Sequence, residues 1–272
     1  ILALTSDELL QLVRDLFSKQ HEVLYYGPSD EGGAKDILAS HHKVAENPMP
    51  LVKDNPVRRP VTDNEVYLAP YDANQFYYVQ YSDRGEKFNV ANDPSVTMYN
   101  NYFGSGMNAI VFQELREARG LAYSAHASLN APSYPDDDYM FYAFIASQND
   151  KLRDAVVEFD RIINQMPESE EAFQVAKASV ISQLRTRRVT GAGVLNQYLS
   201  LRELGLSESR DKAVFEAVRD MTLADVKAFQ QEWIKGREYT YGFLGRESDF
   251  DTAFISTLGP VTHLTLEEIF GY

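Results

Sequence analysis

Arg116 and Tyr123 are the two side chains whose types and spacing best suit chemistry. They lie in the stretch FGSGMNAIVFQELREARGLAYSAHASLN, which runs from 103 to 130. Apolar residues recur at helical spacing over 107–118, and a strand pattern follows over 121–129. Arg116 therefore leaves the last turn of a helix and Tyr123 begins a strand, so a short turn can bring a guanidinium and a phenol together. Both groups donate hydrogen bonds, and the arginine stays protonated, so the pair suits the binding of oxygen atoms.

A purely structural interpretation of the same two residues is also open. An arginine at a helix C-terminus complements the helix dipole. A tyrosine at the start of a strand can lie half in the core. The residues alone do not decide between this interpretation and a functional pair.

Metal and phosphate sites are less well supported. The sequence has five histidines, and none has the H-x-x-E-H or H-E-x-x-H spacing that places two imidazoles and a carboxylate on one helix face. His41 and His42 with Glu46 come nearest, and we expect them to be exposed polar residues. We interpret His126 as an ordinary sheet histidine. For Gly104-Ser105-Gly106 we expect a tight turn with close backbone packing, and for Asp136-Asp137-Asp138 a solvated loop.

Composition excludes several classes of protein. The chain has 272 residues, a net charge of −14, 44% hydrophobic residues and no cysteine. The acidic balance argues against nucleic-acid or anionic-membrane binding and permits cationic peptide partners. No apolar run reaches transmembrane length. The lack of cysteine is compatible with the periplasm or the cytoplasm of a bacterium.

The order of elements predicts an α+β fold. Two strands, 65–69 and 76–82, open the larger part of the chain, and a hairpin of 121–129 with 139–146 follows. Helices then dominate to residue 233, and a last strand covers 239–244. We expect a largely antiparallel sheet with helices packed on one face.

A repeat indicates two homologous segments. Thr5 and Glu8 form a capping box ahead of a helix, and Thr222 and Asp225 do the same. A strand pattern and a glycine then follow each helix, at 22–27 and at 239–245. We predict that 1–50 is the C-terminal tail of a preceding homologous domain, that 51–62 is a proline-rich linker and that 63–272 is a complete domain. A start at isoleucine rather than methionine fits a fragment, although helix–strand–glycine is common enough to recur by chance.

The stretch from Phe112 to Ser124, FQELREARGLAYS, closely resembles the signature of the C-terminal, non-zinc domain of the pitrilysin/insulinase-type zinc metallopeptidases. The resemblance extends over essentially the whole chain. It implies the α/β sandwich found in LuxS and the processing peptidases, built as paired domains that enclose a peptide-sized chamber.

The resemblance also implies a function. Arg116 and Tyr123 match an arginine–tyrosine pair that binds peptide backbone and stabilises the oxyanion. The chain lacks the family's H-x-x-E-H motif, so no cofactor is expected in it, and zinc is expected in a homologous half or partner subunit. By itself it is expected to be inactive. We therefore expect the substrate-binding portion of a zinc endopeptidase, with a peptide as substrate; the alternative is a non-catalytic scaffold or partner-binding subunit of the same family.

Overall fold

The computed structural model of the chain describes residues 3–50 and 60–271. It divides into two compact units, of which unit 1 comprises Ile1–Arg58 with Arg188–Ser200 and unit 2 comprises Arg59–Arg187 with Leu201–Tyr272. The predicted linker over 51–62 lies mostly outside the described residues. None of the described helices is long and apolar enough to cross a membrane.

The N-terminal part of unit 1 contains two helices that bury very little of their surface. Helix α1 (Ser6–Leu16) begins with the predicted capping box, in which Thr5 and Glu8 satisfy each other's backbone N–H groups. Helix α2 (Glu31–His41) is capped by Asp30. Ala34 is the single buried residue on these two helices. The strand predicted over 22–26 does not form, because no neighbouring strand lies beside it in unit 1.

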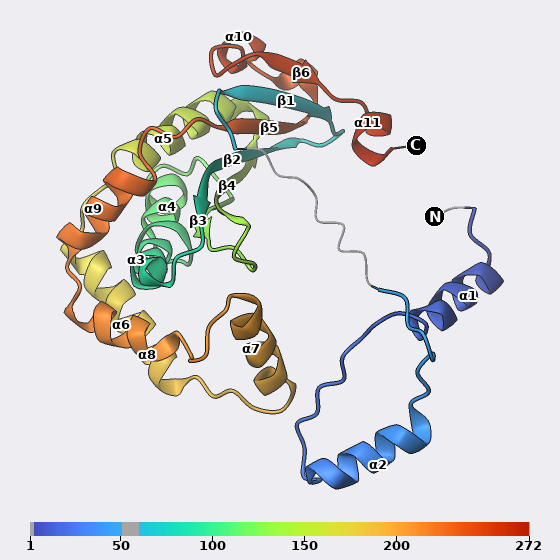
Figure 1. Cartoon of the computed structure of the whole chain (residues 1–272). Helices are drawn as coiled ribbons and strands as arrows, with labels where there is room; N and C mark the ends of the chain where they lie inside the picture. The colour runs from blue at the N-terminus through green and yellow to red at the C-terminus, as the bar shows by residue number, and fades with distance from the viewer. Residues whose placement is uncertain (1–2, 51–59, 272) are drawn as a thin grey trace. The chain divides into compact units, whose positions relative to one another are not determined.

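Unit 2 is built on a six-stranded mixed sheet with the order β3-β4-β2-β5-β1-β6 (Figure 1). Its antiparallel part joins β3, β4, β2 and β5, whereas β1 runs parallel to β5 and β6. The strands are β1 (Glu65–Pro70), β2 (Gln75–Lys87), β3 (Ser124–Asn130), β4 (Asp138–Gln148), β5 (Thr240–Gly245) and β6 (Val261–His263).

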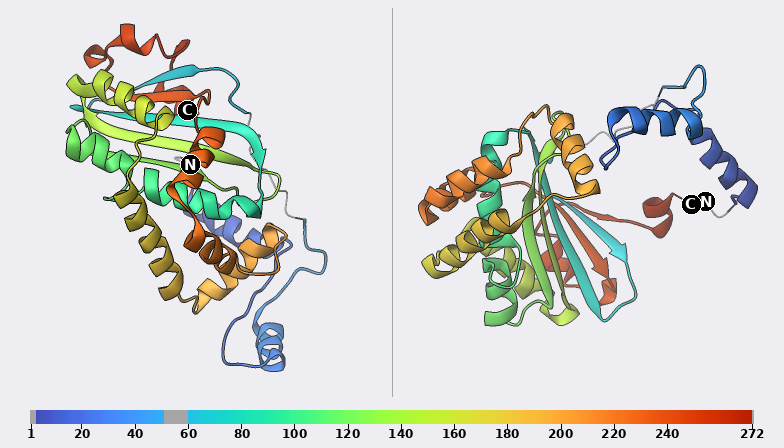
Figure 2. Two further views of the ribbon diagram at one scale, coloured as in Figure 1. Left: turned by 90° about the vertical axis from the view of Figure 1, so that its left-hand side faces the viewer. Right: turned by 90° about the horizontal axis from the view of Figure 1, so that it is seen from below.

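Helices cover one face of this sheet (Figure 2). The α+β architecture and the one-sided helix layer therefore agree with the sequence-based prediction. The helical segments of this unit are α3 (Asp93–Tyr99), η2 (Asn100–Gly104), α4 (Ile110–Phe112), η3 (Gln113–Ala118), α5 (Leu152–Asn164), α6 (Glu170–Thr186), α8 (Asp211–Asp220), α9 (Leu223–Trp233), α10 (Thr252–Ile255) and α11 (Leu266–Phe270). Helix α7 (Ala192–Glu203) belongs largely to unit 1.

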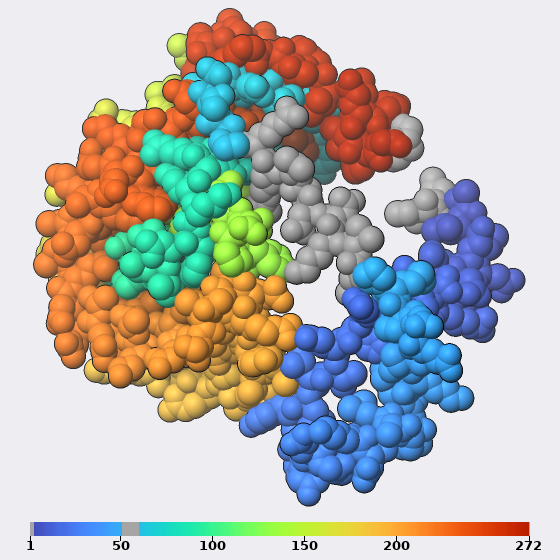
Figure 3. Space-filling view, in the orientation of Figure 1, coloured from blue at the N-terminus to red at the C-terminus, as the bar shows by residue number. Residues whose placement is uncertain are grey.

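The core lies between the sheet and the helix layer. Alternate residues of β2 and β4 point into it, among them Phe76, Tyr78, Phe141 and Ile145. Helix α3 contacts both α8 and α9 although more than a hundred residues separate it from them in the chain, and Figure 3 shows green and orange atoms side by side there. This packing gives the strands a rigid backing.

Two local predictions were wrong in detail. The helix expected over 107–118 begins only at Ile110 and is π-helical from Gln113. The third strand begins at Ser124, three residues later than predicted, which changes the position of Tyr123.

Candidate functional site

Tyr123 projects into solvent beside the start of β3. Its side chain is 75% exposed, while the preceding Ala122 is buried. Its backbone N–H donates to the carbonyl of Ala146, so the residue is fixed to the end of β4. Residues 121–123 precede the regular strand, so Tyr123 does not follow the alternation of β3, in which Ala125 and Ala127 are buried. The phenol is therefore free to meet a ligand.

Arg116 lies on the π-helical turn η3 and reaches Tyr123. The centre of its guanidinium is 5.3 Å from the Tyr123 ring centroid and 4.9 Å from that of Phe112. A cation held over two aromatic faces is oriented without losing its hydrogen-bonding N–H groups. Its one carboxylate contact within ion-pair distance among the described residues is Glu117 at 3.8 Å. The structure thus brings the two predicted residues together.

The second arginine of the motif is occupied elsewhere. Arg119 pairs with Glu114 at 2.9 Å and with Glu158 of α5 at 3.0 Å. Arg161 also pairs with Glu158, and its hydrogen bonds lower the pKa of that carboxyl group. This cluster fastens η3 to α5. It leaves Arg116 as the motif arginine that can face a ligand.

A pocket of about 330 Å³ adjoins Tyr123 at this end of the sheet. It is lined by Gln75, Gly120, Ala122, Tyr123, Ser147, Gln148 and Lys151. Gly120 has φ +58°, a left-handed conformation that ends the helix and that side chains rarely adopt. The Lys151 ammonium donates to the Gly120 carbonyl at 2.8 Å and holds this turn against η4 (Asn149–Lys151).

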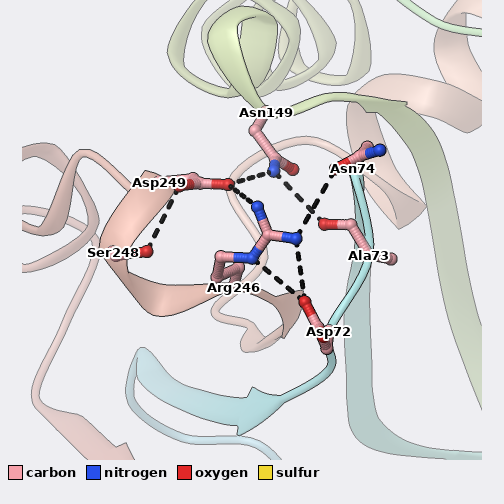
Figure 4. A network of polar contacts seen from close by, with 7 residues as sticks. All are labelled: Asp72, Ala73, Asn74, Asn149, Arg246, Ser248 and Asp249. Atoms are coloured by element: carbon pink, nitrogen blue, oxygen red, sulfur yellow. Dashed lines mark hydrogen bonds and ion pairs between the residues drawn. The ribbon is translucent and has the colours of Figure 1, made fainter.

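A polar network joins the chain segments next to the pocket residues Gln75 and Gln148 (Figure 4). Arg246 binds Asp72 in the β1–β2 turn at 2.8 Å and Asp249 at 3.3 Å. Asp249 also accepts a hydrogen bond of 2.8 Å from Asn149. Three separate chain segments are thereby joined just beyond the strand ends that carry Gln75 and Gln148.

The other end of β3 is held by a side-chain amide. Asn100 accepts a hydrogen bond from the N–H of Leu129 and donates one to its carbonyl, both at 2.9 Å. Nearby, Gly104 approaches the strand so closely that a Cβ there would lie 1.8 Å from the Ala127 oxygen. The glycine-rich turn thus serves close packing, as predicted.

Two other candidates from the sequence, His126 and the acidic turn at 136–138, contact neighbouring side chains. His126 stacks on Phe144 with ring centroids 5.2 Å apart, and burial lowers its pKa. In the acidic turn, Lys87 pairs with Asp138 at 2.7 Å and donates to the Asp136 carbonyl.

One histidine contact was not predicted. His42 faces His21, with the two Nε2 atoms 2.6 Å apart, instead of grouping with His41 and Glu46. No sequence pattern predicts this contact, because the two histidines are 21 residues apart with no motif between them. Across residues 3–50 and 60–271, no group of three or more His, Cys, Asp or Glu side chains is placed to hold a metal ion.

Comparison with known families agrees with this architecture. The family model of the peptidase M16 inactive domain matches residues 3–180, which is more than half of the chain. The chain belongs to this family. The match includes both the predicted tail and the start of the predicted second domain, so it leaves the boundary between them a prediction. The M16 assignment bears out the resemblance seen in the sequence.

Solved structures share the M16 domain's fold at low sequence identity. A peptidase M16 inactive domain from Pseudomonas fluorescens superposes with a TM-score of 0.61 at 16% identity, covering 80% of this chain and 51% of that one. A protease from Helicobacter pylori gives 0.59 at 12%, covering 79% and 53%. Complex III2 from Candida albicans, with Inz-5 bound, gives 0.56 at 17%, covering 87% and 57%. A search of curated proteins found no match. The chain thus spans little more than half the length of these structural neighbours.

Proposed function

We propose that this chain is the substrate-binding, non-zinc portion of a zinc metalloendopeptidase. The observation that carries the proposal is the exposed side chain of Tyr123, whose ring lies against the oriented guanidinium of Arg116. Membership of the M16 family supports a peptide as the substrate class. The zinc ion and the general base belong to a homologous half or partner subunit.

The two side chains have complementary tasks in this proposal. Hydrolysis of a peptide bond builds negative charge on the carbonyl oxygen, and the Tyr123 hydroxyl donates a hydrogen bond to it there. Arg116 holds a neighbouring backbone carbonyl with a charge-assisted hydrogen bond. Because an arginine cannot accept a proton, it binds and orients only.

The proposal predicts separate effects on turnover and on metal content. In the complete metallopeptidase, Tyr123→Phe removes the donor to the oxyanion and lowers kcat by about 10²–10³-fold. Arg116→Ala weakens peptide binding and lowers kcat/KM. Zinc content stays unchanged in both, because the proposal assigns the zinc ligands to the homologous half or partner subunit. Tyr26→Phe, the same change at another exposed tyrosine, is the control.

Peptide turnover measured with zinc analysis on the same preparations checks these effects. Wild-type turnover in both variants would exclude the assigned role.

A non-catalytic role is the second candidate function. It is favoured by the family's description as an inactive domain and by the likeness to a chain of Complex III2 from Candida albicans. Co-expression with the zinc-bearing half separates the two. A stoichiometric complex that cleaves no peptide supports the scaffold, and cleavage that depends on Tyr123 supports the enzyme.

A further inference from the structure

The pocket beside Tyr123 has an unusual charge for this protein. The chain carries a net charge of −14, yet no carboxylate lines this pocket, and Lys151 is the one charged residue among its lining residues. Tyr123 belongs both to the pocket and to the pair with Arg116. A group that enters the pocket therefore lies next to whatever the pair binds.

Lys151 keeps donors available to a ligand. An ammonium group has three N–H donors, and the Gly120 carbonyl accepts one of them. Within the described part of the chain, no carboxylate lies within ion-pair distance of Lys151 Nζ, so its charge is not neutralised by a salt bridge. The side chain is half-buried, which reduces the screening of its charge by solvent.

Three acidic residues near the pocket, Asp72, Asp249 and Glu117, are already paired. Asp72 and Asp249 both bind Arg246 in the network of Figure 4. Glu117 lies next to Arg116 at 3.8 Å. These contacts reduce the negative potential that would otherwise oppose an anion near Lys151.

Strand pairing and hydrogen bonds hold the residues that line the pocket in place. Gln75 and Gln148 are directly opposite each other in the β2–β4 register. The residues next to them, Asn74 and Asn149, belong to the Arg246 network. Ser147 donates to the Leu121 carbonyl at 2.5 Å. The pocket is thus preformed, which lowers the entropic cost of binding.

We propose that this pocket is a subsite for a carboxylate group of the bound peptide. The carboxylate is either the side chain of an acidic residue or the free C-terminus. The inference rests on the proposed function, in which Arg116 and Tyr123 bind the peptide backbone. Lys151 binds the carboxylate, and the amides of Gln75 and Gln148 surround it.

Peptide binding to the 272-residue chain tests the subsite. The probes are dye-labelled octapeptides with both ends blocked, in which glutamate, glutamine or lysine is placed at each position in turn. A second pair carries a free or an amidated C-terminus and distinguishes the two sources of the carboxylate. At one position, or at the C-terminus, we expect the acid to bind about fivefold more tightly than its neutral counterpart, the upper range for a partly exposed ion pair.

Substitutions of Lys151 should change only the preference for the acidic peptide over its neutral counterpart. Lys151→Met abolishes it, Lys151→Arg retains it and Lys151→Glu transfers it to the lysine peptide. Lys177→Met is the matched control, because Lys177 also donates to a backbone carbonyl at 2.8 Å, that of Met221, but lies on α6. The control should keep the preference, and Trp233 fluorescence verifies that each variant is folded.

The outcomes separate the subsite from the proposed function. If peptides bind and Arg116→Ala weakens them all, but acid and amide bind equally well, the subsite is wrong and the proposed function stands. If Lys151→Met still binds the acidic peptide more tightly than its neutral counterpart, the subsite is also wrong. If no peptide binds, both are wrong.

Discussion

Arg116 and Arg119 show how two like residues in one motif take different roles. They are three positions apart on the same turn. Arg119 is bound by Glu114 and Glu158, whereas Arg116 rests on the rings of Phe112 and Tyr123. The two arginines differ because the neighbouring helix α5 places Glu158 within ion-pair distance of Arg119 but not of Arg116.

Gly104 offers a prediction at the residue scale. A Cβ at this position would lie 1.8 Å from the oxygen and 2.7 Å from the carbonyl carbon of Ala127, and backbone atoms of a sheet cannot retreat cheaply. We expect Gly104→Ala to lower the free energy of unfolding by about 3 kcal/mol, at the upper end of overpacking costs. Urea unfolding monitored by Trp233 fluorescence measures it.

A matched glycine controls this experiment. In Gly193→Ala the new Cβ would lie 3.6 Å from the nearest atom, the Cγ1 of Val189, and Gly193 is in helix α7. We expect it to be neutral or slightly stabilising. Wild-type stability in Gly104→Ala would mean that the turn and β3 are not in close contact.

Residue types and spacing predicted the meeting of Arg116 and Tyr123, because helix and strand patterns fix the turn between them. The exposure of Tyr123 was not predictable, since the strand pattern began three residues too early and left open both a half-buried tyrosine and an exposed functional one. No motif or spacing pattern in the sequence indicates a role for Lys151. Its position beside Tyr123 depends on the hairpin register, which brings the end of β4 to the start of β3.

At the scale of elements, the π-helical turns η2 and η3 distinguish this domain from a sequence-based expectation of ordinary helix. A helical pattern of apolar residues predicts that a helix forms but not its hydrogen-bond spacing. The wider turn η3 carries Arg116, and η2 carries Asn100 and Gly104. Both turns therefore position residues that contact β3 or its start.

The link between η3 and α5 gives a pH prediction. Hydrogen bonds from Arg161 and the nearby charge of Arg119 lower the pKa of Glu158 in the folded protein. A lowered carboxylate pKa adds stability above the unfolded-state value, about 4.3, and this stability is lost as the pH falls through the folded-state pKa. We expect Glu158→Gln to cost about 1–2 kcal/mol at pH 7 and progressively less below pH 4.

Urea unfolding at several pH values checks this dependence. Asp220→Asn is the control, because Asp220 forms an ion pair with Arg219 in which both side chains are mostly exposed. We expect no measurable change there. A Glu158→Gln effect that stays constant down to pH 3 would contradict the lowered pKa.

Whether a segment forms a helix or a strand was predictable where its pattern of apolar residues extended over many positions. The apolar stripe of α5 and the alternation of β4 both gave correct elements, since each buries one face. The strand expected over 22–26 had the right residues but no partner. Strand formation depends on a neighbouring strand, and local sequence carries no information about its absence.

At the scale of the whole molecule, α1 and α9 form a matched pair with opposite environments. Both have eleven residues and begin with the same kind of capping box. Val226 and Phe229 of α9 are buried under the sheet of unit 2. At the same distances from the capping threonine, Leu9 and Leu12 of α1 are at least half exposed. We infer that α1 packs against a sheet of its own in the complete protein.

This inference predicts that Leu12→Ala lowers the free energy of unfolding more in the complete protein than in this chain. Leu12→Ala in this chain should change stability by less than about 0.5 kcal/mol, as expected for an exposed site. In the complete protein it should cost about 2–5 kcal/mol, because a core leucine is lost. Phe229→Ala should be costly in both. Urea unfolding of each form measures the difference, and an equally small effect of Leu12→Ala in the complete protein would refute the inference.

The amide of Asn100 has a consequence for association between molecules. A strand at the end of a sheet offers unpaired N–H and C=O groups that can recruit a strand from another chain and start aggregation. At Leu129 both groups are satisfied by one side chain, and at Ala127 the backbone of Gly104 occupies the approach. This half of the β3 edge is therefore closed to edge-to-edge assembly without a proline or a charged residue in the strand.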